Sequence, residues 1–372
     1  MKIALVHEYL NQFGGAERML LALCSIFSDA PIYTLFYDAK ATGGVFEGRD
    51  IRTSFLQKFP FVKKHHRGFP LLMPFAIEQF DFSDFDIVLS VSASFAKGII
   101  TKPYTKHICF CLTPPRFLWD DSHKFVEEFG YSKLVKGILP PFVSYLRVWD
   151  REASYRVDEF WAISDFVKER IKKYYLQEST VIYPPVDISK FITNNQQPTT
   201  NNYFLMVGRL VAYKRFDLGI KAFAKLGLPL KIVGVGPELN KLRSLASGFS
   251  RSKASGTSGI EFLGQVSDDR LADLYSKTQA LVFPQEEDFG IVPLEAMASG
   301  RPVIAYRAGG VVETIVEGKT GIFFDEQTVG ALEQAVKNFN SNKFNPEDCR
   351  KQAEKFSVEV FRQNMLKKLS IL

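Results

Sequence analysis

Residues 281–302 read LVFPQEEDFGIVPLEAMASGRP, and this stretch sets the expectation for the whole fold. The apolar run at 281–283 predicts a short buried strand, and an acidic turn follows it. Gly290 then opens a predicted helix, which Gly300 and Pro302 bring to an end. A strand, a loop and a helix in this order are typical of an α/β protein with a parallel sheet.

Two carboxylates flank the start of this predicted helix: Glu287 lies before it and Glu295 lies within it. The N–H groups of Phe289, Gly290 and Ile291 fall at the helix start, where unpaired donors and the helix dipole favour an anion such as a diphosphate. Acids beside an anion site suit a ligand that carries both phosphates and hydroxyls, such as a nucleotide sugar. The alternative is an ordinary strand, loop and helix with solvated acids. The agreement of the strand, the Phe-Gly pair and the helix stop favours the ligand site.

Length and composition indicate a protein of two globular domains. A chain of 372 residues is too long for one ordinary core, and 46% hydrophobic with 24% charged residues is typical of globular proteins. No apolar run predicts a signal peptide or a transmembrane anchor. The four cysteines have no metal-ligand spacing, so we expect reduced thiols, no metal site and a cytoplasmic protein.

The same strand, glycine loop and helix pattern opens both halves of the chain. In the first half, the strand at 2–6 leads to Gly14 and Gly15, after which residues 19–27 have helical apolar spacing. In the second half, the strand at 203–207 leads to Gly208 and a predicted helix. Strands and helices alternate between these points, which predicts an α/β protein with two Rossmann-like domains.

The sequence EDFGIVPLEAMASGRPVIA, residues 287–305, resembles the donor-site signature of retaining glycosyltransferase family four. The resemblance implies the GT-B fold, in which two Rossmann-like domains face each other across a cleft and the last helix crosses back to the first domain. On this basis, residues 1–177 and 357–372 would form an acceptor-side domain. Residues 178–356 would form the donor-binding domain.

The resemblance also implies three catalytic residues. Arg209 and Lys214 are similar to the family's basic pair on the donor diphosphate, where cations stabilise the negative charge that grows on the leaving group. Glu287 would hold sugar hydroxyls and stabilise positive charge near the anomeric carbon. For Arg209 and Lys214 taken alone, a solvated surface pair is the alternative.

Further donor contacts follow from the same resemblance. Glu295 would accept hydrogen bonds from the ribose hydroxyls, and the backbone of Val266 would meet the base. Gly15 would bring bare backbone close to the donor phosphates. The amides of Phe289, Gly290 and Ile291 complete the expected donor site.

Residues 111–120, CLTPPRFLWD, resemble the Cys-His-Thr-Pro-x-Arg-Tyr-x-Trp-Asp segment of mannosyltransferases from bacterial polysaccharide and O-antigen biosynthesis. Leu112 departs from this pattern, because it stands where the relatives have a histidine that reaches the transferred sugar. Arg116 either fills part of this gap on the acceptor or sugar side, or pairs with Asp120 or Asp121.

The sequence therefore predicts a retaining, metal-independent glycosyltransferase without a cofactor. It would move a hexose, with mannose from GDP-mannose as the first choice, to a lipid-linked or polysaccharide acceptor. The alternatives are a UDP-sugar-dependent enzyme and a non-catalytic nucleotide-sugar-binding subunit.

Residues 55–72, FLQKFPFVKKHHRGFPLL, mix lysine and arginine with phenylalanine and leucine and contain no acid. This segment either docks on the inner face of an anionic membrane or is a solvated loop whose aromatic side chains fold into the core. No nucleic-acid-binding module is recognisable, so we expect no nucleic-acid partner.

Overall fold

The computed structural model describes residues 1–120, 133–192, 202–250 and 259–370. It divides into two compact units, Met1–Pro184 and Pro185–Leu372. The division lies later in the chain than the boundary expected after residue 177, because a further strand, β7 (Ser179–Val181), pairs with β6 (Glu159–Ala162) of the first sheet. The expected assignment of residues 357–372 to the first domain stays a prediction.

The first unit is built on a seven-stranded sheet in which all neighbouring strands are parallel. The order is β3-β2-β1-β4-β5-β6-β7, with β1 (Ile3–His7), β2 (Ile32–Thr34), β3 (Ile51–Thr53), β4 (Ile87–Ser92) and β5 (Lys106–Cys111) before β6 and β7. Every residue of β4 is buried, as expected for a central parallel strand with helices on both faces.

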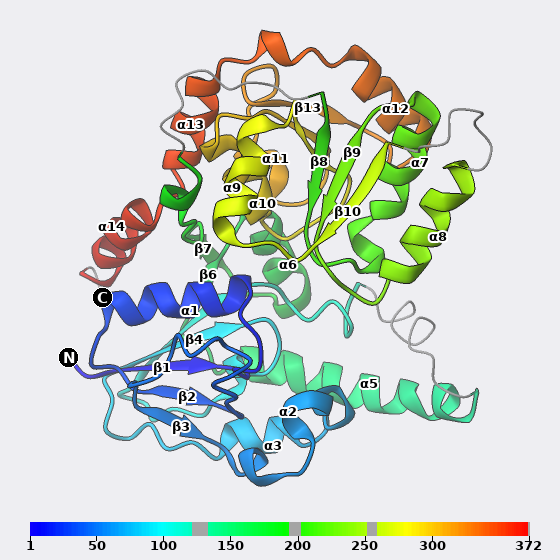
Figure 1. The fold of residues 1–372 in the computed structure, drawn as a ribbon. Helices are drawn as coiled ribbons and strands as arrows, with labels where there is room; N and C mark the ends of the chain where they lie inside the picture. The colour runs from blue at the N-terminus through cyan, green and yellow to red at the C-terminus, as the bar shows by residue number, and fades with distance from the viewer. Residues whose placement is uncertain (121–132, 193–201, 251–258, 371–372) are drawn as a thin grey trace. The chain divides into compact units, whose positions relative to one another are not determined.

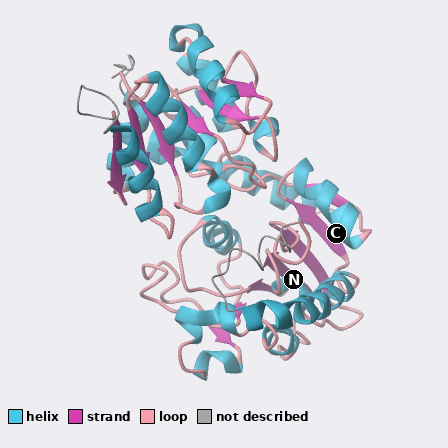
Figure 2. Cartoon of the chain, turned by 90° about the vertical axis from the view of Figure 1, so that its right-hand side faces the viewer, coloured by secondary structure: helices cyan, strands magenta, loops and turns pink. Residues whose placement is uncertain are grey.

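Helices cover both faces of this sheet (Figure 1; Figure 2 shows the strands in magenta between them). They are α1 (Gly15–Ile26) on one face, α2 (Val62–His65), α3 (Met73–Glu78) and α5 (Lys133–Ser154) on the other, and α6 (Asp165–Tyr175) after β6. Three short 3-10 helices join these elements: η1 (Phe55–Lys58), η2 (His66–Gly68) and η3 (Ala96–Gly98).

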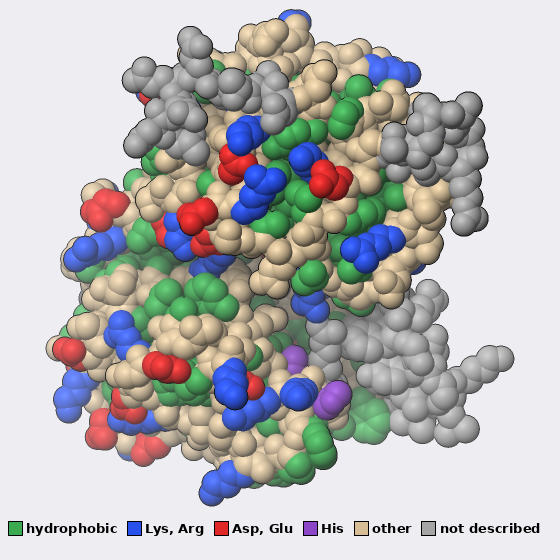
Figure 3. Space-filling view, in the orientation of Figure 1, with side chains coloured by type: hydrophobic (Ala, Val, Ile, Leu, Met, Phe, Trp, Pro, Cys, Tyr) green, Lys and Arg blue, Asp and Glu red, His purple; other side chains and the backbone are tan. Residues whose placement is uncertain are grey.

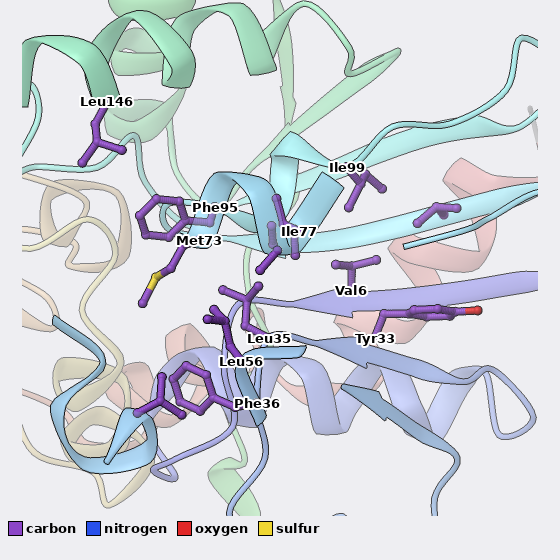
Figure 4. Close-up of a cluster of buried hydrophobic side chains, with 14 of the residues drawn as sticks. Val6, Tyr33, Leu35, Phe36, Leu56, Met73, Ile77, Phe95, Ile99 and Leu146 are labelled. Atoms are coloured by element: carbon purple, nitrogen blue, oxygen red, sulfur yellow. The ribbon is translucent and has the colours of Figure 1, made fainter. Parts of the chain in front are cut away.

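A hydrophobic cluster holds α2, α3 and α5 on the sheet (Figure 4). Its members include Val6 of β1, Ile77 of α3, Phe95 just before η3 and Leu146 of α5. The helix α6 illustrates how local sequence sets the ends of an element. Ser164 caps it by accepting a hydrogen bond from the Val167 N–H at 3.0 Å.

The second unit is built on a six-stranded parallel sheet in the order β10-β9-β8-β11-β12-β13. The strands are β8 (Phe204–Val207), β9 (Leu230–Val233), β10 (Ile260–Gly264), β11 (Leu281–Phe283), β12 (Val303–Tyr306) and β13 (Gly321–Phe324). The apolar run at 281–283 is therefore a buried central strand, as predicted.

Helices again lie on both faces of this sheet (Figure 1). On one face, α7 (Phe216–Leu226), α8 (Leu239–Ser250) and α12 (Val329–Asn338) share a core with the strands. The others are α9 (Asp268–Lys277), α10 (Ile291–Ala298), α11 (Val311–Thr314), α13 (Pro346–Glu354) and α14 (Val358–Leu369), with 3-10 turns η4 (Ile188–Phe191), η5 (Ala212–Lys214) and η6 (Ser341–Lys343).

In each sheet, successive strands are added toward one edge and then, from one point on, toward the opposite edge. In the first sheet this point lies between β1 and β4, and in the second it lies between β8 and β11. In open α/β sheets, ligands bind next to such a reversal, outside the carboxyl ends of the strands. The loops that follow β8 and β11 are therefore the natural location for a site in the second unit.

Candidate functional site

The loop that follows β8 folds back so that Lys214 lies against Gly208. A Cβ atom added to Gly208 would lie 3.2 Å from the Lys214 Nζ, so the missing side chain leaves room for the ammonium group. Arg215, next in the chain, adopts the left-handed conformation with φ 51° and begins α7. Its guanidinium donates to Gln327 Oε1 at 2.9 Å and pairs with Asp217, which fixes the end of the loop.

The loop that follows β11 brings a carboxylate to this ammonium. The Nζ of Lys214 lies 2.6 Å from Glu287 Oε1, and the two side chains are only 12% and 17% exposed. Because β8 and β11 are neighbouring parallel strands, their two loops meet at the same edge of the sheet. The pair therefore lies at the reversal point of the second sheet.

Burial lowers the pKa of the Lys214 ammonium, but the charge of Glu287, a neighbouring tyrosine and the hydrogen bond to Glu287 raise it. The pKa lies above its ordinary value as a result, and Lys214 is protonated at neutral pH. The positive charge of Arg209 acts in the opposite direction and lowers this pKa, so Arg209 lies within electrostatic reach of Lys214. Arg209 is exposed, and no other described residue forms a hydrogen bond or ion pair with its side chain.

Two glycines of the loop after β12 hold the Glu287 loop in place. Glu287 forms an isolated β-bridge with Gly309, and the Gly310 N–H donates to the Glu287 carbonyl at 2.8 Å. A Cβ atom at Gly309 would lie 2.2 Å from the Glu287 carbonyl oxygen, and one at Gly310 would lie 2.4 Å from that of Asp288. The close backbone contact thus requires glycine at both positions.

The helix α10 begins four residues after Glu287 with unpaired donors. Gly290 is its N-cap with φ 88°, a left-handed conformation that favours glycine, and no side chain caps the helix. In the described part of the chain, the N–H groups of Gly290 and Ile291 donate to no protein acceptor. Phe289 is buried and its ring packs on Phe356 at 5.7 Å, which anchors the helix start. These donors and the helix dipole suit an anion, and the expected contact with a diphosphate stays a prediction.

The second predicted carboxylate lies inside α10 and has a partner that sequence reasoning missed. Glu295 is 5% exposed, and its Oε2 accepts a hydrogen bond from the hydroxyl of Tyr275 at 2.9 Å. Tyr275 lies on α9 beside Leu274 and fits the apolar spacing of that helix, so it resembles an ordinary core residue. The sequence signal that could have found it is a tyrosine hydroxyl at a position where the apolar spacing of α9 predicts burial.

Val266, the expected contact for the base, lies in the loop between β10 and α9. It is half-buried, and no described group forms a hydrogen bond with its backbone. Because β10 also ends at the carboxyl edge of the second sheet, Val266 shares that edge with Lys214 and Glu287. Its contact with a base stays a prediction.

The remaining expected site residues belong to the first unit. Gly15 is the first residue of α1, and the N–H of Gly14 before it donates to Glu17 Oε2 at 2.7 Å. Leu112 follows β5 and donates its N–H to the Ser92 carbonyl at 2.8 Å. The guanidinium of Arg116 lies over the Phe166 ring at 6.0 Å. The approach of these residues to a donor or acceptor stays a prediction.

Of the two acids proposed as partners of Arg116, Asp120 pairs with Arg170 and accepts a hydrogen bond from the Tyr174 hydroxyl. Asp121 lies outside the described residues. Within the described ranges, no group of three or more His, Cys, Asp or Glu side chains could hold a metal ion. Likewise, no described helix combines the length and apolar composition that crossing a bilayer requires.

Comparison with known proteins agrees with this geometry. Residues 187–356 match the family model described as glycosyl transferases group 1. The matched range contains the Lys214–Glu287 pair and α10, so the site lies within the region that is similar to glycosyl transferases group 1.

Two curated relatives extend the similarity. The chain is 28% identical over 218 residues to an uncharacterized glycosyltransferase of Methanocaldococcus jannaschii, and the match spans 57% of this chain and 59% of that protein. It is 24% identical to alpha-1,3/1,6-mannosyltransferase ALG2 of Dictyostelium discoideum, over 98% of this chain and 97% of that protein.

The fold has known relatives as well. The crystal structure of Anabaena HepE in complex with UDP superimposes with a TM-score of 0.72 over 100% of both chains, at 16% sequence identity. This similarity confirms the predicted fold class, two parallel-sheet Rossmann-like units of the GT-B type.

Proposed function

We propose that the chain is a retaining, metal-independent glycosyltransferase that moves a hexose from a nucleotide sugar to a glycan or lipid-linked acceptor. One observation carries this proposal: Lys214 and Glu287 form a protected pair at the reversal point of the second sheet, next to the unpaired amides of α10. Arg209 adds an exposed cation within electrostatic reach.

These groups suit the departure of a nucleoside diphosphate. When the bond between the anomeric carbon and the phosphate oxygen breaks, negative charge grows on the leaving group. Lys214, Arg209 and the N–H groups of Gly290 and Ile291 stabilise that charge most strongly when it is fully developed. Arg209 can contact phosphate oxygens with two N–H groups, whereas Lys214 acts as a point charge.

The new bond forms between the acceptor oxygen and the same face of the anomeric carbon, and the acceptor proton passes to the departing phosphate oxygen. No protein base is needed on this route, so Leu112 in place of histidine does not prevent turnover. Glu287 lies beside Lys214 and stabilises positive charge on the sugar ring. Glu295 accepts hydrogen bonds from the ribose, and Val266 contacts the base.

GDP-mannose is the first candidate donor. The support comes from the resemblance of residues 111–120 to mannosyltransferases and from the mannosyltransferase relative in Dictyostelium discoideum. A UDP-sugar is the alternative donor, and the structural neighbour solved with UDP makes it the comparison to include. A non-catalytic nucleotide-sugar-binding subunit is the third possibility.

The test combines binding and turnover. Thermal shifts with GDP, UDP and ADP identify the base, and we expect the largest shift with GDP. Incubation with GDP-mannose or UDP-sugars in the presence of a chelator then measures donor turnover, which Glu287→Ala should abolish without loss of binding. Absence of a shift with every nucleotide would contradict the donor site, and binding without any turnover would favour the non-catalytic subunit.

We further propose that residues 55–72 contact an anionic membrane surface. Phe59 and Phe61 are 39% and 75% exposed, and the last turn of α2 carries Lys63 and Lys64. In Figure 3, Lys, Arg and His side chains gather over the region of α2. Exposed aromatic and basic side chains together favour the interface of anionic lipids.

Co-sedimentation with phosphatidylglycerol vesicles and with neutral phosphatidylcholine vesicles tests this contact. We expect binding to the anionic vesicles alone, weakened by salt and by Phe61→Ser. Phe142→Ser, which removes an exposed phenylalanine of α5, is the matched control and should bind as the original protein does. Equal sedimentation with both lipids would contradict an electrostatic contact.

A further inference from the structure

A buried tyrosine hydroxyl group donates a hydrogen bond to one oxygen of the Glu295 carboxylate. Tyr275 is fully buried on α9, Glu295 is 5% exposed on α10, and the Tyr275 hydroxyl donates to Glu295 Oε2 at 2.9 Å. The bond joins residues 20 positions apart in the chain and links the two helices. A hydrogen bond to an ionised carboxylate in a buried setting is stronger than one between neutral groups.

The tyrosine ring is itself held in one orientation. The ring of Phe191, in η4, packs edge-on against the Tyr275 ring, with centroids 5.6 Å apart and an interplanar angle of 85°. The carbonyl of Phe191 accepts a hydrogen bond at 3.0 Å from the hydroxyl of Ser299, which ends α10. The helices α9 and α10 and the turn η4 therefore fix the position of the Tyr275 hydroxyl together.

Without this bond, the terminal torsion of a glutamate side chain is broad and the carboxylate plane turns easily. Two neighbouring ribose hydroxyls need two acceptor positions in a defined plane, because hydrogen bonds weaken steeply with poor angles. A fixed donor on one oxygen sets that plane before the ligand arrives.

We infer that Tyr275 is a positioning residue for ribose recognition, which orients Glu295 toward the 2′ and 3′ hydroxyls of a nucleoside diphosphate. The inference rests on the proposed function, since it requires Glu295 to be the ribose contact. Tyr275 does not itself touch the nucleotide. Its removal should affect the discrimination of ribose from deoxyribose rather than phosphate binding.

The experiment compares the dissociation constants of GDP and 2′-deoxy-GDP by calorimetry, in the intact chain and in Tyr275→Phe. In the intact chain, loss of one hydroxyl that bonds to a carboxylate should weaken binding about 10-fold or more. In Tyr275→Phe, which keeps the ring, we expect GDP to bind more weakly while 2′-deoxy-GDP changes little. The dissociation constant of 2′-deoxy-GDP should then exceed that of GDP by only about 2- to 3-fold. If UDP or ADP gives the larger thermal shift, that nucleotide and its 2′-deoxy form replace the guanine pair.

Tyr203→Phe is a matched control. Tyr203 is also buried in the second unit, and its hydroxyl donates to the carbonyl of Leu274 at 2.8 Å, next to Tyr275 in the chain. Its loss removes a buried hydroxyl bond near α9 without touching the carboxylate. We expect Tyr203→Phe to lower the melting temperature but to leave the ratio of the dissociation constants of GDP and 2′-deoxy-GDP unchanged. The control thus separates the orientation of Glu295 from the general stability of the unit.

The outcomes distinguish this inference from the proposed function. If the intact chain binds no nucleotide, the proposed function and the inference both fail. If it binds GDP and 2′-deoxy-GDP equally, the ribose contact of Glu295 and the inference both fail, while glycosyl transfer from a nucleotide sugar stands. If Tyr275→Phe keeps the full ratio, the inference alone fails. Should Tyr275→Phe not fold, Phe191→Leu keeps the hydroxyl and loosens the ring. A reduced ratio in that variant supports the inference, and an unchanged ratio overturns it.

Discussion

Two lysine–carboxylate pairs of the same chemistry occupy different settings in the two units. In the first unit, Lys97 and Asp150 are each 1% exposed, whereas Lys214 and Glu287 of the second unit are 12% and 17% exposed. Lys97 also donates to the Ser94 carbonyl at 2.6 Å, and Asp150 accepts from the Trp119 indole N–H at 2.9 Å. The second pair lies at a sheet edge with an exposed arginine in electrostatic reach.

The difference separates a structural ion pair from one that can exchange partners. Each member of the Lys97–Asp150 pair has a second hydrogen bond inside the unit, and loss of either partner leaves a buried charge. Lys214 can transfer from Glu287 to a phosphate oxygen, because both groups reach solvent at the edge of the sheet. We therefore expect the same substitution to reduce stability in the first unit and activity in the second.

The largest effect should follow from Lys97→Met. The substitution keeps most of the side-chain volume but leaves the Asp150 charge buried, which costs about 3–5 kcal/mol of unfolding free energy. Urea denaturation measures this loss. The double variant Lys97→Met, Asp150→Leu removes both charges and should recover much of it, so a double variant as unstable as the single one would contradict an electrostatic cause.

Lys214→Met should reduce activity much more than stability. The unfolding free energy should change by about 1 to 2 kcal/mol, less than in the first unit, because Glu287 is 17% exposed and keeps contact with water. Turnover of the donor should fall about 100- to 1000-fold, because the leaving diphosphate loses a cation. Lys225→Met is the control, since Lys225 pairs with Glu333 of α12 at the end of α7 farthest from the loop. Normal turnover in Lys214→Met would remove Lys214 from the mechanism.

The pH dependence of stability should also differ between the units, because all five histidines lie in residues 1–184. Burial lowers the pKa of His107 to about 3, so this side chain is neutral in the folded protein. Below pH 6.5 the unfolded chain takes up a proton that the folded chain does not, and stability is lost as the pH falls. His107→Gln should therefore remove about 2 kcal/mol of the loss in unfolding free energy that occurs between pH 6.5 and 5.

Urea denaturation at several pH values between 5 and 8 tests this expectation. His65→Gln is the control, because His65 is exposed and the substitution should leave the pH profile unchanged. A profile for His107→Gln as steep as that of the original protein would show that other groups cause the acid sensitivity.

The smallest effects concern two serine caps that differ in burial. Ser164 begins α6 in the first unit and is fully buried, whereas Ser267 begins α9 in the second unit and is exposed. We expect Ser164→Ala to cost about 2 kcal/mol and Ser267→Ala about 0.5 to 1 kcal/mol, as measured by thermal or urea unfolding. Equal losses would mean that burial does not strengthen the cap.

The parts of the fold that the sequence predicted are those with local signals. The strand at 281–283 and the stop at Gly300 follow from an apolar run and a left-handed glycine, which act within a few residues. The strand β3 was missed because Ile51–Thr53 has only three residues, and one of them is an exposed arginine. It forms only because β2 lies beside it at the sheet edge.

The same distinction applies to the site. Lys214 and Glu287 lie 73 positions apart, and the resemblance predicted both, but their direct contact depends on the neighbouring placement of β8 and β11. Tyr275 was missed because the partner that gives its hydroxyl a role lies on another helix. The Lys97–Asp150 pair was missed for the same reason, since 53 positions separate its members.

The glycine pair at 309 and 310 has a consequence for how this protein can diverge. A methyl group at Gly309 would overlap the carbonyl of Glu287, so the loop would have to retreat from β12 and carry its carboxylate with it. The spacing between an acid and a base is thus controlled from a third strand that contributes neither of them. Substitution at these two positions would therefore alter the Lys214–Glu287 charge arrangement itself.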